Sequence, residues 1–129
     1  MDQALCGRIM LNGDCGSYFY NPELWQPEGG PYHKVSIHRM VHSLAAAGID
    51  TFLINPNMQL PCYPSKRLRY MYQDYKRGDR EYGRLYWQEC EGWTGDALEE
   101  ILDRQAFVRD KHLDLIEEGT DWLEETSLA

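Results

Sequence analysis

The chain has 129 residues, of which 43% are hydrophobic, which fits a single domain with a buried core. No run approaches the roughly 18 apolar residues of a membrane-spanning helix, so no membrane contact is expected, and the net charge of −8 argues against nucleic acid as the main partner. The first six residues carry neither a basic stretch nor a long apolar one, so a secretory signal is not expected. Together with four cysteines that lack paired spacing, this predicts a cytoplasmic protein with reduced thiols at Cys6, Cys15, Cys62 and Cys90.

The first half of the chain predicts a strand, a helix and a second strand. The strands are expected over residues 8–12 and 51–55, with the helix over 36–47 between them. In this order the strands must be adjacent and parallel, joined by a right-handed crossover. The second strand is almost continuously apolar, which is typical of a strand covered on both faces.

The helix expected over 36–47 has signals at both ends. Ser36 is a plausible N-cap, and Gly48 can adopt the left-handed conformation that ends a helix. Its apolar face is predicted to consist of Ile37, Met40, Val41, Leu44 and Ala45.

Polar side chains follow both predicted strands. Asn12 and Asp14 come at the end of the first, and Asn55 and Asn57 at the end of the second. Parallel α/β folds place their ligand sites beyond the carboxyl ends of the strands, so these four residues are expected on one rim. Asn offers a donor and an acceptor and Asp accepts from hydroxyls, a combination that suits a sugar.

A long aromatic loop is expected to lie on the same rim. It covers residues 14–31 and carries Tyr18, Tyr20 and Trp25. Loops of this length in compact domains are frequently functional. These rings are predicted either to fold over a ligand or to fill part of the core.

The second half of the chain is predicted to be mainly helical. Ser65 is expected to cap a helix over 66–76, and residues 79–93 to form a loop with a short helical piece. The buried stripe of the first of these helices would consist of Leu68, Met71, Tyr72 and Tyr75.

The clearest helix is expected over 96–118. Asp96 and Glu99 resemble a capping box, and Gly119 would end the helix. A short helix is expected over 120–125. The apolar side of the long helix would be Leu98, Ile101, Leu102, Val108, Leu115 and Ile116.

Charge is distributed unevenly along the chain. Residues 65–89 hold seven basic and four acidic side chains, whereas residues 90–129 hold three basic and twelve acidic ones. Opposite charges attract, so the two segments are predicted to face each other. Interleaved tyrosines in the basic segment also fit a nucleic-acid accessory surface, the weakest of the functional alternatives.

Two strands with open edges make an incomplete sheet. The edges are completed by further sequence, by another copy of the chain, or by covering helices. The first of these is favoured, which makes 1–129 a single partial α/β domain, with a strand–loop–helix–strand unit and rim loops in 1–64 and mainly helices in 65–129.

Four motifs follow one another in the chain, Arg8–Asp14, Ala47–Phe52, Asn55–Asn57 and Tyr63–Lys66. Their order and spacing resemble the start of a bacterial family with a glycoside-hydrolase-like (β/α)8 barrel and mostly unassigned function, and a looser likeness continues through 115–121. The resemblance implies a parallel βαβα segment that opens such a barrel, with a carbohydrate ligand at the rim. In the family the catalytic carboxylates come from later strands, so no catalytic residue is assigned.

Other constellations compete with the rim. Asp14 with Glu23 or Glu28 could form a carboxylate pair, but a turn-capping Asp14 beside solvated glutamates is favoured. His38 and His42 share a helix face but lack the rest of a zinc motif, so no metal is expected. No phosphate-binding loop is present, and no cofactor is expected.

Two functions of different classes therefore remain. The first is a carbohydrate-active, glycoside-hydrolase-like barrel segment that is not catalytic on its own. The second is a non-enzymatic α/β interaction module that self-associates through its open sheet edges.

Overall fold

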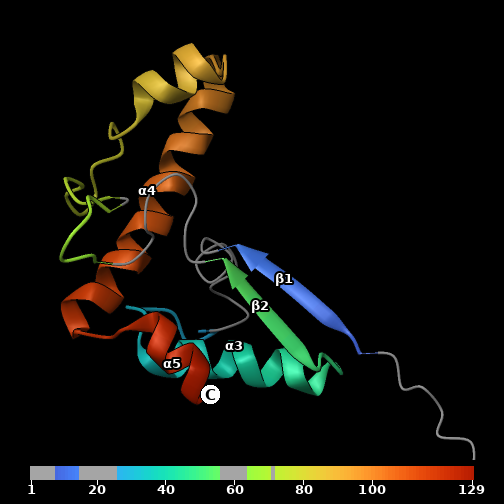
Figure 1. Ribbon diagram of the computed structural model, residues 1–129. Helices are drawn as coiled ribbons and strands as arrows, with labels where there is room; N and C mark the ends of the chain where they lie inside the picture. The colour runs from blue at the N-terminus through green and yellow to red at the C-terminus, as the bar shows by residue number, and fades with distance from the viewer. Residues whose placement is uncertain (1–7, 15–25, 56–63, 71) are drawn as a thin grey trace, which may run out of the picture.

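The computed structural model describes residues 8–14, 26–55, 64–70 and 72–129 of the chain. Over these residues the fold is mixed α/β, with a two-stranded parallel sheet as predicted. Figure 1 shows the sheet beside α3 and α5, while the long α4 extends away from them. The elements in chain order are β1 (Met10–Asp14), α3 (Lys34–Ala46), β2 (Thr51–Asn55), the π-helix η1 (Tyr86–Cys90), α4 (Gly95–Glu118) and α5 (Trp122–Leu128).

The two strands pair in parallel along their whole length, which confirms the predicted arrangement. Strand β2 occupies the expected residues, whereas β1 begins two residues later than the expected range 8–12. Ile9, the residue before β1, is already hydrogen-bonded to Asp50, the residue before β2. The backbone N of Ile9 donates to Oδ2 of Asp50 at 2.9 Å, and the backbone N of Asp50 donates to the carbonyl of Ile9 at 2.9 Å. These bonds fix where the strands begin to pair.

The sheet is covered on one face in the described part of the chain. Phe52 and Ile54 pack against the core, while Met10 and Leu53 on the opposite face are 62% and 49% exposed. The expectation that the second strand is covered on both faces is therefore wrong, because the core helices all pack on the side of Phe52 and Ile54. Close packing on this side also explains Gly13, where a Cβ atom would lie 2.5 Å from the ring of Phe52.

The core lies between the covered sheet face and three helices. Side chains from α3, α4 and α5 meet there, and α5 packs directly on α3. Burial of large apolar side chains is the main stabilising contribution available to this chain. The buried members are Tyr32, Ile37, Met40, Val108, Leu115 and Trp122.

Helix α3 begins at Lys34, with His33 as its N-cap, so the prediction that Ser36 is the N-cap is wrong. Ser36 lies in the first turn, where its Oγ accepts from the backbone N of His33 at 3.4 Å and donates to Oε1 of Gln26 at 2.7 Å. Gln26 is buried and needs this partner. Gly48 has φ +88°, which confirms the left-handed residue expected after the helix.

The helix predicted over 66–76 is not formed. Ser65 does cap a turn, since its Oγ accepts from the backbone N of Arg67 at 3.3 Å and of Leu68 at 3.1 Å. The described residues that follow form bends and turns instead of a helix. Tyr72 has φ +65°, a left-handed conformation that a right-handed helix cannot contain. Leu68, expected in a buried stripe, is 63% exposed.

The remaining helices follow the predictions more closely. The short helical piece expected within 79–93 is the π-helix η1, and Gly119 ends α4 with φ +79°. Asp96 is not the N-cap of α4, because the helix begins one residue earlier and Thr94 occupies the cap. Asp121 caps α5 by accepting two backbone N–H bonds. None of the described helices is both long and apolar enough to cross a membrane.

The basic segment 65–89 lies against the acidic helix α4, as the charge distribution predicted. Three of its arginines, Arg77, Arg80 and Arg84, form ion pairs with carboxylates of α4. These carboxylates, at 2.7–3.0 Å, are Glu99, Asp103, Asp114 and Glu117.

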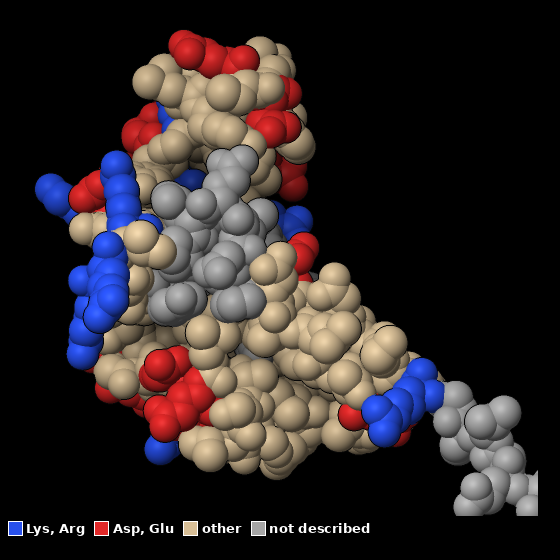
Figure 2. Space-filling model, in the orientation of Figure 1, with Lys and Arg blue, Asp and Glu red and all other residues tan. Residues whose placement is uncertain are grey.

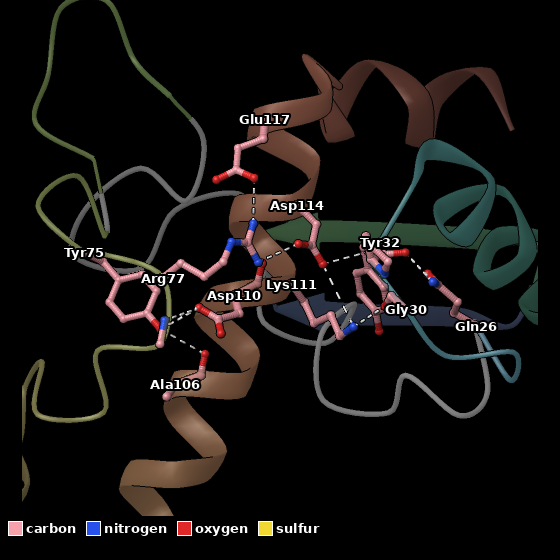
Figure 3. Close-up of polar contacts among 12 residues, drawn as sticks. Gln26, Gly30, Tyr32, Tyr75, Arg77, Ala106, Asp110, Lys111, Asp114 and Glu117 are labelled. Atoms are coloured by element: carbon pink, nitrogen blue, oxygen red, sulfur yellow. Dashed lines mark hydrogen bonds and ion pairs between the residues drawn. The ribbon is translucent and has the colours of Figure 1, made fainter.

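Asp114 is the most buried of these partners, with a side chain only 7% exposed. Its Oδ1 accepts from Nη1 of Arg77 at 2.7 Å, and its Oδ2 accepts from the backbone N of Tyr32 at 2.9 Å (Figure 3). Nζ of Lys111 lies 4.0 Å from Oδ2. One carboxylate thus joins the segment before α3, the basic segment and α4.

We expect Asp114→Ala to destabilise the fold by roughly 2–3 kcal/mol, because it leaves the buried N–H of Tyr32 unpaired and removes the anion beside two cations. Asp103→Ala is the matched control. It also removes an arginine partner from α4, but Asp103 is 68% exposed and little change is expected. Urea unfolding followed by tryptophan fluorescence measures the free energy of unfolding of both variants and of the parent. An equal loss of this free energy in the two variants would contradict the central role of Asp114.

Candidate functional site

Three of the predicted rim residues meet at the carboxyl end of the sheet. Asp14 lies opposite Asn55 in the strand register, and Asn12 lies opposite Leu53. Alternation along each strand puts these four side chains on the same face. All four are exposed, and this is the face left uncovered by the core helices. The parallel pairing therefore brings Asn12, Asp14 and Asn55 together, as predicted.

The other predicted ligand residues lie outside the described residues. They are Tyr18, Tyr20, Trp25 and Asn57, together with Glu23 of the alternative carboxylate pair.

Glu28, the second candidate partner of Asp14, is engaged elsewhere. Its Oε1 accepts from Nη1 of Arg39 on α3 at 2.6 Å. The hydrogen bond from Arg39 holds the pKa of Glu28 below its usual value. A carboxyl group kept ionised in this way is a poor proton donor, so Glu28 does not fit the acid of a glycosidase pair.

The histidines of α3 contact the C-terminal part of the chain. Nε2 of His38 lies 2.7 Å from Oε2 of Glu125, and Nε2 of His42 lies 3.2 Å from the carbonyl of Ala129. Among the residues described, no group of three or more His, Cys, Asp or Glu side chains is placed to hold a metal. Cys90 has a free, exposed thiol. The helix-packing interpretation of His38 and His42 is thus the one the contacts support.

A buried cation on α4 was not predicted from the sequence. Arg109 is 3% exposed, and its guanidinium carbon lies 5.7, 5.5 and 5.1 Å from the ring centroids of Tyr72, Tyr75 and Tyr82. Its Nε and Nη1 have no hydrogen-bond partner in the part of the chain that is described. Burial lowers the pKa of Arg109. The three rings supply the cation–π attraction that offsets part of this cost.

A sequence signal for this cluster exists in the spacing of the long helix. Arg109 and His112 continue the three- and four-residue spacing of Leu98, Leu102 and Gln105, all of which are buried. A helical pattern that counts only apolar residues omits Arg109 and His112. Their position marks a second packed face of α4, and the basic segment packs on this face.

Tyr75 connects this cluster to the acidic face of α4 (Figure 3). Its hydroxyl donates to Oδ1 of Asp110 at 2.7 Å and lies 3.2 Å from the carbonyl of Ala106. Burial and the hydrogen bond to Asp110 raise the pKa of Tyr75 far above its usual value. The hydroxyl therefore stays protonated and acts as a donor that fixes the segment on α4, with no capacity as a base near neutral pH.

We expect His112 to make the fold acid-sensitive. Burial lowers its pKa from 6.5 to about 4, so between these values the unfolded chain binds a proton that the folded chain does not. Stability is therefore lost as the pH falls through 6.5, by about 2 kcal/mol between pH 7.5 and pH 5. Denaturant unfolding at both pH values should show this loss in the parent and a smaller one in His112→Gln. An imidazole that titrates near 6.5 in NMR spectra of the folded chain would contradict it.

No protein-family model matches the sequence, and comparison with curated proteins and with solved structures gives no match.

Proposed function

We propose that the chain is a carbohydrate-binding segment of a glycoside-hydrolase-like (β/α)8 barrel, in which β1 and β2 are neighbouring barrel strands. The observation that carries the proposal is the parallel register that places Asp14 beside Asn55 at the carboxyl end of the sheet. Ligand sites of such barrels are built at this end of the strands. The resemblance of the strand, helix and rim motifs to a barrel family supports the same assignment.

The chemistry of the rim suits hydroxyl groups. Asn12 and Asn55 offer both donors and acceptors, and Asp14 accepts from hydroxyls. The three residues are exposed on one face, where a ligand can reach them. In this proposal Asp14 binds and orients sugar, while the catalytic carboxylates belong to other strands of the barrel.

The binding test compares Asp14→Ala with Asp96→Ala, the same substitution at an exposed position in the first turn of α4. Cellotriose, xylotriose and maltotriose are titrated by calorimetry against both variants and the parent. Loss of a hydrogen bond to the charged group should weaken binding by roughly 1.5–3 kcal/mol in the first variant only. If none of the sugars binds the parent, or if both variants lose the same amount of binding free energy, the carbohydrate proposal fails.

A second function, a self-associating interaction module, is favoured by the uncovered sheet face. Met10 and Leu53 are 62% and 49% exposed, and β1 and β2 pair with each other alone in the described sheet. Apolar side chains beside unpaired strand edges promote pairing with another chain. In this proposal the same face is an interface between copies.

Sedimentation velocity over a range of concentrations tests the module. Leu53→Glu, on the sheet, should reduce concentration-dependent association, because it places a charge in the apolar interface. Leu68→Glu is the matched control, since Leu68 is 63% exposed and lies outside the sheet. A compact monomer that melts cooperatively above about 60 °C would rule out the module.

A further inference from the structure

A basic basin lies in the segment that follows the sheet. It is an open hollow of about 480 Å³ at the start of the basic segment. Figure 2 shows Lys and Arg side chains gathered along one edge of the molecule, at the left of the view. The basin is lined by Ser65, Lys66, Arg67, Leu68, Arg69, Gln73 and Asp74.

The cations of the basin differ from the other arginines of the same segment. Arg77, Arg80 and Arg84 are committed to carboxylates of α4. The side chains of Lys66 and Arg67, by contrast, form no ion pair with any described residue and are exposed. Their charge is therefore available to a ligand and is not used to hold the fold.

The net charge of the lining matches a dianion. Three cations and one carboxylate line the basin, which leaves two positive charges. The carboxylate, Asp74, accepts a hydrogen bond from Nη2 of Arg69, so part of that guanidinium is already engaged. A phosphate ester carries about −1.5 to −2 charges near neutral pH, so it is balanced by such a lining.

The neutral polar groups of the basin are arranged as donors. Oγ of Ser65 already accepts from two backbone N–H groups, so its hydroxyl hydrogen is left to donate. Oε1 of Gln73 accepts from the backbone N of Tyr70 at 3.4 Å, which leaves the amide Nε2 as a donor. Neutral donors next to the ammonium group of Lys66 and the guanidinium group of Arg67 are of the kind that bind phosphate oxygens in proteins.

We propose that this basin binds the phosphate group of a small phosphate ester. The inference does not depend on sugar binding at Asn12, Asp14 and Asn55, and it stands if that proposal fails. Lys66 and Arg67 supply the uncommitted charge, and Ser65 and Gln73 supply neutral donors to the same group.

The test removes two charges inside the basin or two outside it. The basin variant carries Lys66→Gln and Arg67→Gln together. The control variant carries Lys34→Gln and Lys76→Gln, which change the net charge by the same amount at exposed positions outside the lining. Inorganic phosphate and glucose 6-phosphate are titrated by calorimetry and phosphorus NMR at low ionic strength. Circular dichroism confirms that both variants are folded.

The basin variant should bind both probes at least about tenfold more weakly, because it loses two charge-assisted contacts. The control variant should bind as the parent does, and neutral glucose should not compete. Tighter binding of glucose 6-phosphate than of phosphate would show that the basin takes an ester and not the free ion.

Three results would overturn the proposal. One is the lack of saturable binding of either probe to the parent. Another is an equal loss in both variants, which indicates general attraction to positive charge. The last is binding of single-stranded oligonucleotides that tightens with length and that neither phosphate nor glucose 6-phosphate displaces, which would assign the surface to nucleic acid.

Discussion

The arrangement of the chain depends on one nearly buried carboxylate. Asp114 is on α4, where removal from water makes an unpaired charge expensive. Its two oxygens are satisfied by groups far apart in the sequence, the backbone N–H of Tyr32 and the guanidinium of Arg77. The segment leading into α3 and the basic segment are thereby fixed to the same turn of α4. The sheet is linked to this turn through α3 and the shared core.

Arginines hold the basic segment on α4 in two further, physically different ways. Arg80 and Arg84 pair with exposed carboxylates on α4 and remain in contact with water, where each ion pair contributes little because of screening and side-chain entropy. Arg109 is removed from water and surrounded by tyrosine rings, without a carboxylate at hydrogen-bond distance in the described structure. The ion pairs therefore set the register of the basic segment on α4. The packing of Tyr72, Tyr75 and Tyr82 around Arg109 holds it there.

One-sided coverage of the sheet explains why two proposals arise from the same surface. The core helices occupy the face of Phe52 and Ile54, so the opposite face carries its side chains into solvent. At the carboxyl end that face is polar, with Asp14 beside Asn55, and toward the amino end it is apolar, with Met10. A ligand that needs hydroxyl recognition fits the first region, and another sheet or chain fits the second.

The sequence by itself determined the elements whose signals are local or periodic. The parallel strands, α3, α4, the left-handed Gly48 and Gly119, and the attraction between the basic and acidic segments all follow from spacing, backbone preference and charge. Tertiary structure decided the rest. Residues 66–76 follow the capping residue Ser65 and have a helical apolar spacing, yet the described residues of this segment form bends and turns, with Tyr72 in a left-handed conformation and Tyr75 packed against α4. The burial of Arg109, and the free charge of Lys66 and Arg67, depend on which carboxylates of α4 each cation reaches. That choice is made by the packing of distant segments, which no local pattern encodes.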